Sequence, residues 1–512
     1  MREQISACHE PQELKAAIER FLSSARNPTL IEPGEDPFAL APGQVSLEIH
    51  HSWLLLQVWD ASRNIVRRLI RLDSEKAGRI DVIFERFGRR TGKLSLVDLA
   101  RPDRQEAGKR SYRQAFREQF RRFLRRQFPR WQLAELSTEP DLQHSLSPAY
   151  PRAMLRKGTS AWAAIASPPD HSEPSGCLTF GLIWLEYLRR REPRLCVGGL
   201  AVFVPRNQHL TTALRMRLLN PDAARYLLFL YDEDGFEEVA DLADCGNLQT
   251  SLPPWRRSDG LDDPLVEHLQ KLEHVEVIPA NDGTLHFRVR GLTFAVYREG
   301  KVVFGAETKT VADASNFKEL ERIAAEIGRL RAAEAPDRRN PIFLKKPESW
   351  LESSVRASLV EIDPFLLPSP VYGQVPAFAG GDRDVLDLLA VERQGRLVVV
   401  ELKTTADPHL PLQALDYWMR VDWHARRGDF TACGYFPGVP LSTQSPRLLL
   451  VSPAMCFHPT TQDVLRYLSP EIEVERVGLN IEWQRRLKVL YRVRGAGSAQ
   501  WAAAEQERGN GA

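Results

Sequence analysis

The stretch GDRDVLDLLAVERQGRLVVVELKTTADPHLPLQALDYW, residues 381–418, decides how the C-terminal part of this chain folds. Two apolar runs flank the turn sequence RQG at 393–395, a pattern that predicts an antiparallel hairpin. The second run ends abruptly in the charged sequence ELK at 401–403. A turn centred near the middle of RQG places Asp387 of the first strand beside Glu401 of the second.

The charges at the end of the second strand are expected to gather at one place. Side chains alternate along a strand, so Glu401 and Lys403 point to one face and Leu402 points to the other. Like charges beside an apolar core are unfavourable unless a cation neutralises them. All-oxygen ligands suit a hard divalent cation, so the pattern predicts a site for Mg²⁺ or Mn²⁺.

The hairpin with its charged end resembles the PD-(D/E)XK nuclease superfamily, the restriction-endonuclease-like fold. Glu352 in SWLESSVR stands where such enzymes often carry a helical glutamate. Gln413 and Tyr417 in QALDY reproduce the Gln-x-x-x-Tyr pattern of the RecB and lambda-exonuclease branch. The resemblance covers residues 343–495, and the proline of the family name is absent before Asp387.

The resemblance implies a metal centre that hydrolyses phosphodiester bonds of DNA. Asp387, Glu401 and the carbonyl of Leu402 would hold Mg²⁺ (or Mn²⁺), with Glu352 as an outer or second-metal ligand. Such a metal binds a phosphate oxygen, lowers the pKa of a bound water and stabilises the leaving 3′ oxygen. Asp382 and Asp384 compete with Asp387 for the ligand position, although neither is followed directly by an apolar run.

The same resemblance gives roles to three further side chains. Lys403 would orient the water or neutralise charge that develops on the phosphate. Gln413 and Tyr417 share one helical face and would position the strand backbone, although Tyr417 could instead be a core aromatic, as we expect Trp418 to be. His424 and His458 receive no role, because a lone histidine is more often structural than catalytic.

Breaks in composition predict several parts, with an overall α/β fold class. The C-terminal part is expected to be a restriction-endonuclease-like mixed sheet flanked by helices, preceded by an α+β region. The expected parts are an N-terminal segment 1–40, an accessory α/β region 41–250, a β-meander plus helix 262–340, the nuclease-like domain 343–495 and a disordered tail 496–512.

The accessory region repeats the element order of the nuclease-like domain, although its residues differ. One interpretation is a degenerate copy in which the strand SAWAAIAS (160–167) takes the place of LVVVELK (397–403). The other interpretation is that two α/β segments alternate in the same order by chance. Only the second copy would carry the charged cluster.

Composition limits the classes of protein that this chain can be. Its 512 residues, 69 of them basic and 67 acidic, give a net charge of +2, which does not indicate a nucleic-acid binder from bulk charge. The six cysteines are scattered, which argues against a zinc site or a disulfide framework. Neither a signal sequence nor a membrane-spanning apolar run is evident, so we expect a cytoplasmic protein without a membrane partner.

One segment is locally basic. KRSYRQAFREQFRRFLRRQFPR, residues 109–130, contains nine lysines and arginines and a single acid. It could contact the phosphates of a duplex, or it could be an amphipathic helix with a solvated basic face. The resemblance of residues 343–495 implies a Mg²⁺-dependent deoxyribonuclease, with RNA kept open as a substrate. The alternative is a catalytically silent nuclease fold that binds nucleic acid or regulates a partner.

Overall fold

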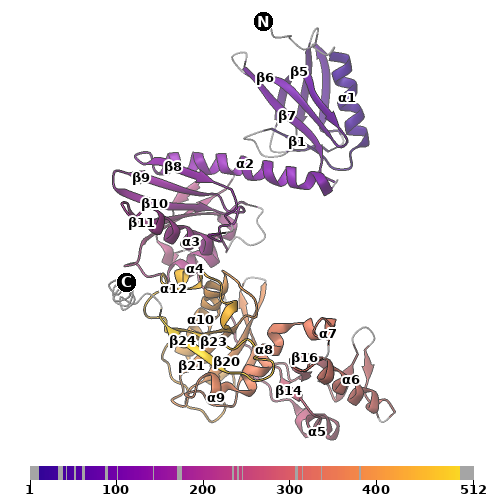
Figure 1. Ribbon diagram of the computed structural model, residues 1–512, viewed down its shortest axis with the longest axis vertical. Coiled ribbons are helices and arrows are strands. Elements are labelled where there is room, and N and C mark those ends of the chain that lie inside the picture. Colours follow the sequence, from indigo (N-terminus) through magenta and orange to yellow (C-terminus); the bar gives the residue numbers. More distant parts are fainter. Residues whose placement is uncertain are drawn as a thin grey trace. The chain divides into compact units, whose positions relative to one another are not determined.

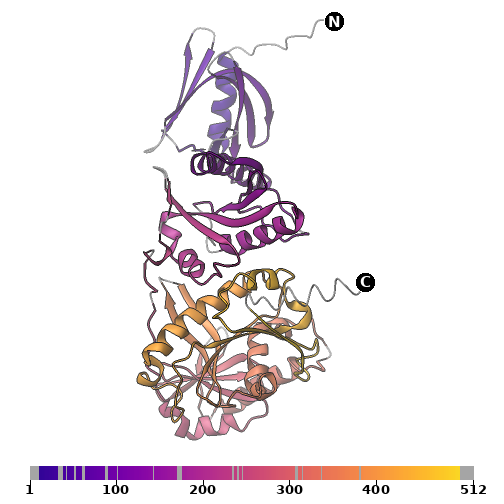
Figure 2. The same cartoon turned by 90° about the vertical axis from the view of Figure 1, so that its left-hand side faces the viewer.

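The computed structural model describes residues 11–495 except 33–37, 42, 51–52, 60–63, 87–89, 101, 142, 170–175, 233–235, 239–240, 245, 249, 306–308, 314, 336 and 380–381. The expected tail 496–512 lies outside the described residues. The chain forms two compact units, residues 1–206 with 229–238 and residues 207–228 with 239–512 (Figure 1, Figure 2). Both are mixed α/β, and none of the described helices has the length and apolar character to cross a membrane.

The first unit begins with a seven-stranded antiparallel sheet of order β2-β1-β7-β6-β5-β4-β3. Helix α1 lies against the sheet and buries Leu14, Ile18 and Phe21 in the apolar core (Figure 1). The elements are α1 (Pro11–Ser24), β1 (Pro28–Ile31), β2 (Phe38–Ala39), β3 (Val45–His50), β4 (Trp53–Trp59), β5 (Asn64–Lys76), β6 (Arg79–Arg86) and β7 (Arg90–Asp98).

A separate six-stranded sheet of order β13-β12-β11-β10-β9-β8 follows. The region 41–250, expected as one accessory region, therefore contains strands of two sheets, because residues 45–98 pair with the N-terminal strands. The elements are α2 (Pro102–Gln127), β8 (Gln132–Ser137), β9 (Arg152–Lys157), β10 (Ser160–Ala166), α3 (Gly176–Arg191), β11 (Cys196–Pro205), the 3-10 turn η1 (Arg206–Gln208), α4 (Leu210–Met216), β12 (Arg225–Tyr231), β13 (Phe236–Glu238) and η2 (Leu242–Asp244).

A five-stranded antiparallel meander of order β14-β15-β16-β17-β18 opens the long part of the second unit. Helix α6 packs Leu320, Ala324 and Ile327 into the core of this sheet, and their three- and four-residue spacing places them on one face of the helix. The elements are η3 (Asp259–Asp262), α5 (Pro264–Gln270), β14 (Val275–Pro279), β15 (Leu285–Val289), β16 (Leu292–Arg298), β17 (Lys301–Phe304), β18 (Thr310–Val311), α6 (Phe317–Leu330) and α7 (Pro341–Leu344).

The last sheet has six strands in the order β19-β20-β21-β22-β23-β24, with β21, β22 and β23 parallel. Helix α8 packs Leu351 and Val355 into one apolar cluster with Val400 and Leu402 of β21. Helix α10 packs on β21 and β22 without joining that cluster, so it covers the other face. The elements are α8 (Pro347–Ala357), α9 (Leu359–Ile362), β19 (Tyr372–Ala379), β20 (Asp382–Val391), β21 (Leu397–Leu402), α10 (Leu410–Arg427), α11 (Asp429–Ala432), β22 (Arg447–Pro453), η4 (Ala454–Cys456), α12 (Thr461–Leu465), β23 (Val474–Leu479) and β24 (Val489–Arg494).

The hairpin of β20 and β21 has the predicted register. Leu388 lies opposite Val400, as a turn centred near Gln394 requires. Gly395 closes the turn with a φ of +85°, and a Cβ there would lie 1.9 Å from the carbonyl oxygen of Pro440. Only glycine fits this conformation and this close approach, so the turn residue fixes the pairing of both strands.

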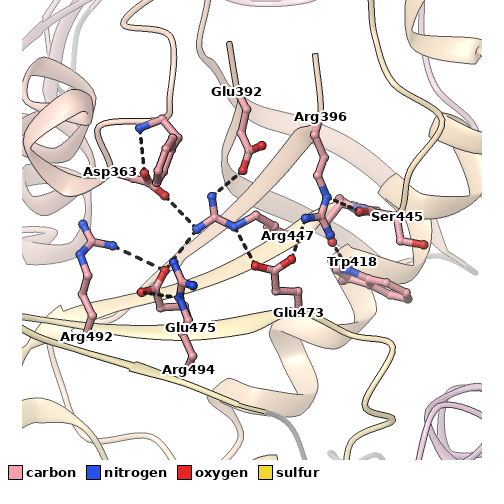
Figure 3. Close-up of polar contacts among 12 residues, drawn as sticks. Asp363, Glu392, Arg396, Trp418, Ser445, Arg447, Glu473, Glu475, Arg492 and Arg494 are labelled. Atoms are coloured by element: carbon pink, nitrogen blue, oxygen red, sulfur yellow. Dashed lines mark hydrogen bonds and ion pairs between the residues drawn. The ribbon is translucent and has the colours of Figure 1, made fainter. Parts of the chain in front are cut away.

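Arg447, the first residue of β22, is the centre of a buried ion-pair cluster (Figure 3). Its Nη2 lies 2.9 Å from Asp363 and 3.2 Å from Glu475, and its Nη1 donates to Glu392. Burial lowers the pKa of Arg447, but these carboxylates outweigh it and hold the pKa above its usual value. The cluster ties α9 and the β20–β21 turn to the sheet. Arg447 pairs with Val398 near the start of β21, whereas Glu401 lies near the end of that strand.

Removing this arginine should destabilise the C-terminal domain. Arg447→Leu leaves Asp363 buried without its cation, and we expect a loss of about 3 to 5 kcal/mol in the free energy of unfolding, measured with urea. Arg492→Ala is the matched control, because Arg492 is partly exposed and lies 3.5 Å from Glu475, so its loss should cost less than about 1 kcal/mol. Equal losses in the two variants would contradict the role of Arg447 as the cation that neutralises the buried carboxylates.

Candidate functional site

Asp387 is held at the end of the hairpin by a backbone hydrogen bond. The amide N–H of Leu402 donates to Oδ2 of Asp387 at 2.8 Å. The observed register, continued by one residue, places Asp387 beside Glu401. Because Val400 and Leu402 belong to the cluster under α8, strand alternation turns Glu401 to the opposite face. Lys403 lies beyond the end of the strand, where its amine reaches Glu348 of α8.

The carboxyl group of Asp387 is difficult to ionise in this position. Burial raises its pKa to about 7, and the negative charges of Glu352 and Glu348 add to the effect. The hydrogen bond from Leu402 and the charge of Lys403 act in the opposite direction without cancelling it. A bound cation would favour the ionised carboxylate.

Lys403 lies among acidic side chains just beyond the end of β21. Its Nζ is 3.7 Å from Oδ2 of Asp407 and 4.0 Å from Oε1 of Glu348. Burial lowers the pKa of Lys403, but the charges of Glu348, Glu401, Asp407 and Asp387 outweigh burial and raise it. Lys403 is therefore an ammonium ion at neutral pH, and it interacts electrostatically with both predicted metal ligands.

Glu352 is buried on α8 between two arginines. Its Oε1 lies 2.8 Å from Nη2 of Arg356, and its Oε2 lies 3.2 Å from Nη1 of Arg288 on β15. The two guanidinium groups neutralise its charge and attach α8 to the meander, so its burial needs no metal. Its role as a metal ligand stays a prediction.

The sequence did not predict that Glu348 and Asp407 lie beside Lys403. Glu348 lies one turn before Glu352 on α8, and this spacing of four residues places both on the same side of the helix. The spacing was the available signal for Glu348. Asp407 follows the strand within the same loop as Lys403, where nothing in the local sequence distinguishes it from a solvated loop residue.

Gln413 and Tyr417 lie on α10, the helix that packs on β21 and β22. Both side chains are half-buried, and the guanidinium of Arg420 lies 6.0 Å from the ring centre of Tyr417. Trp418 is buried and donates from Nε1 to the carbonyl oxygen of Pro446 at 2.7 Å, so it is a core aromatic as expected. The substrate contacts of Gln413 and Tyr417 stay predictions.

Helix α10 is fixed by a buried ion pair that the sequence did not indicate. Nε and Nη2 of Arg215, on α4, lie 2.9 Å and 2.6 Å from the two carboxylate oxygens of Asp416. Asp416 directly precedes Tyr417, so this bidentate pair sets the orientation of the helix face that carries the predicted substrate residues.

Four other residues were considered from the sequence. The side chains of two aspartates lie outside the part of the chain that the structure describes, and two histidines have structural partners. Asp382 and Asp384 belong to β20 rather than to a loop, and their side chains are outside the described part. Nδ1 of His424 is 2.8 Å from Asp429, and Nδ1 of His458 is 2.7 Å from the hydroxyl of Thr460. These contacts give both histidines a structural role.

The basic segment forms the C-terminal half of α2 and buries its aromatic stripe. Phe116 and Phe123 pack near Tyr231, and Phe120 packs against Phe203. The opposite side of the helix exposes Arg122, Arg125 and Arg126. This arrangement suits phosphate contacts and also an ordinary amphipathic helix, so both interpretations remain.

The donor set allows a hard divalent cation. Among the residues that the structure describes, no three His, Cys, Asp or Glu side chains are grouped closely enough to hold a metal ion. The predicted set contains only two carboxylates, Asp387 and Glu401, with the carbonyl of Leu402. Mg²⁺ is commonly held by one or two carboxylates and keeps several waters. The raised pKa of Asp387 marks a place where a cation would be stabilised.

No known protein family matches the chain, and no curated protein matches it either. The fold and the geometry of the site therefore carry the functional argument.

The raised pKa of Asp387 predicts how stability depends on pH. The folded-state pKa of about 7 lies above the ordinary value of 3.8. The contribution of Asp387 to the free energy of unfolding is therefore complete below pH 3.8. It is lost as the pH rises through 7, because the unfolded chain releases this proton more readily than the folded chain does. Asp387→Asn cannot ionise, so without divalent cations it should gain stability relative to the parent chain between about pH 4 and pH 8. Urea unfolding of both chains across this range measures the difference. A constant difference would contradict the burial of an ionisable Asp387.

Proposed function

We propose that the C-terminal domain hydrolyses phosphodiester bonds of DNA with a divalent cation at Asp387 and Glu401. One observation carries the proposal. A half-buried carboxyl group with a raised pKa is tied to the backbone of β21, beside a lysine that stays charged. Perturbed groups of this kind cluster at functional sites, especially at the carboxyl ends of parallel strands.

The cation would be held by the carboxylates of Asp387 and Glu401 and by the carbonyl of Leu402. When bound, it would polarise a phosphate oxygen and lower the pKa of a water molecule. The protein supplies the geometry, because the Leu402 amide fixes the Asp387 carboxylate and the sheet fixes Glu401, which is only 5% exposed.

Lys403 would act as a positive charge rather than as a base. Its raised pKa keeps the amine protonated, and its contacts with Glu348 and Asp407 hold it at the end of β21. A fixed ammonium group stabilises negative charge that develops on a phosphate during hydrolysis. The same ammonium would also draw the phosphate toward the carboxylates, which alone would repel it.

The nucleic-acid strand would be positioned by helix α10. Gln413 and Tyr417 would donate hydrogen bonds to the phosphate backbone, which fixes register without reading sequence. The Arg215–Asp416 pair would keep this helix face in place. DNA as the substrate rests on the resemblance to the RecB branch, and the alternative of a silent domain is less well supported because Asp387, Glu401 and Lys403 are all present.

Cleavage assays with the full chain test the proposal. Single-stranded, duplex and forked DNA, and RNA, are incubated with Mg²⁺, Mn²⁺ or EDTA. We expect cleavage of DNA with either metal and none with EDTA. Asp387→Ala and Glu401→Ala should abolish cleavage and largely spare DNA binding, because phosphate contacts supply most of the affinity. Glu361→Ala on α9 is the control, since this acid is exposed and outside the site.

Two results would contradict the proposal. Turnover that survives either substitution, or that persists in EDTA, would exclude the metal site as described. Tight DNA binding without cleavage under any of these conditions would favour the silent nuclease fold instead.

A further inference from the structure

The two six-stranded sheets share one topology. In each, an antiparallel three-stranded segment is followed by a helix that leads to a parallel fourth strand: β8-β9-β10-α3-β11 in the first sheet and β19-β20-β21-α10-β22 in the second. In each, a short helix then leads to a fifth strand with an antiparallel sixth strand at the edge. Strands β10 and β21 occupy the same place.

The short helix and the turn after it also repeat in sequence. HLTTALRMRLLNPD (209–222) and HPTTQDVLRYLSPE (458–471) share His, Thr-Thr, Arg, Leu and Pro at the same positions. The turns match in detail, because Asn220 accepts from the amide two residues ahead through its side chain, and Ser469 does the same through its hydroxyl. Sequence and structure together indicate a duplication rather than a chance likeness.

The segments 209–222 and 458–471 contact each other at equivalent residues. Leu219 and Leu468 hold the same position in their repeats, and they pair with each other as an antiparallel bridge. The flanking backbone bonds are reciprocal: the amide of Asn220 donates to Tyr467, and the amide of Ser469 donates to Leu218, both at 2.8 Å. Such reciprocity is the property of an isologous contact, in which one surface meets its own copy.

The repeat identifies what stands at the catalytic positions of the first copy. The amide of Lys403 donates to the carbonyl of Val451, and the amide of Ser167 donates to the carbonyl of Phe203. Each donor directly follows the third strand, and each acceptor lies two residues before the proline that ends the fourth strand. Ser167 is therefore the equivalent of Lys403.

The predicted acidic ligands are also replaced in the first copy. Ile165, two residues before Ser167, is the equivalent of Glu401, and its partner on β9 is Arg152, the equivalent of Asp387. Arg152 is buried, with its guanidinium 5.5 Å from the ring centre of Trp184. Helix α3 contains no glutamine, so the Gln-x-x-x-Tyr pattern is missing as well. The first copy therefore lacks the equivalents of Asp387, Glu401, Lys403 and Gln413.

We infer that the chain is a fused pair of copies of one unit, of which only the second cuts, and that it therefore breaks one strand of a duplex at a time. The inference rests on the proposed nuclease function. The strands of a duplex are related by two-fold symmetry, so a pair of identical units offers one reaction centre to each strand. Here one centre remains. One water is consumed, one P–O bond breaks, and the nick leaves a phosphate on one end and a hydroxyl on the other.

A time course with supercoiled plasmid DNA and the full chain, in Mg²⁺ or Mn²⁺, tests the inference. Nicked circles should accumulate first, and linear DNA should appear only later, when independent nicks coincide. Linear DNA formed from the start, without a nicked intermediate, would overturn the inference and leave the nuclease function intact. Cleavage of single-stranded circles but not of plasmid DNA would also overturn the inference and leave the nuclease function intact. Absence of cleavage on every substrate would overturn both the inference and the proposed function.

Equivalent substitutions in the two copies sharpen the test. Lys403→Ala should slow nicking by about 100-fold, the usual cost of losing one group that stabilises transition-state charge. Ser167→Ala, its equivalent in the first copy, should leave the rate within about two-fold, because that copy does no chemistry. Glu401→Gln provides a second inactive variant of nearly the same shape if Lys403→Ala does not fold. A comparable loss of nicking in a Ser167→Ala chain that unfolds in urea like the parent would show that the first copy contributes to cleavage, and would overturn the inference.

Discussion

The hydrogen bond from the Leu402 amide to the Asp387 carboxylate joins the proposed site to the fold. It forms only when β20 and β21 pair in the observed register, and Gly395 in the turn sets that register. A slip by one residue would turn Asp387 toward the apolar cluster under α8 and expose the residues that now fill it. The register that the core requires is therefore the register that brings the charged side chains together.

Buried charges lie near both ends of β21, and their surroundings differ. At one end, Arg447 and its carboxylates neutralise one another (Figure 3). At the other end, the pKa of Asp387 is raised because burial and its acidic neighbours outweigh the Leu402 hydrogen bond and the charge of Lys403. Protein groups alone neutralise the first cluster, whereas the proposed cation would favour the ionised form of Asp387 in the second.

Local signals in the sequence were sufficient for the hairpin. The turn sequence at 393–395 and strand alternation predicted its register. The Arg215–Asp416 pair and the two arginines around Glu352 could not be predicted, because each joins residues far apart in the chain. Residues 41–250, expected as one region, contribute strands to two sheets because β7 returns to pair with β1, and no local signal indicates that long-range pairing.

The inferred repeat is indicated by residues as well as by the order of elements. Element order alone left chance as an equal explanation, whereas the shared residues at 209–222 and 458–471 tie the two halves together. The inferred copies differ at the positions of the proposed chemistry, where Arg152 stands in place of Asp387 and Ile165 in place of Glu401.

Binding of Mn²⁺ to the full chain near pH 7, measured by calorimetry in two buffers of different ionisation enthalpy, tests the central claim most directly. The account predicts one ion per chain, with release of about half a proton, because an Asp387 pKa of about 7 leaves that carboxyl half protonated before the ion binds. Binding and proton release should both disappear in Asp387→Asn and in Glu401→Gln. Absence of binding in the parent chain, or binding that both substitutions leave unchanged, would contradict the account.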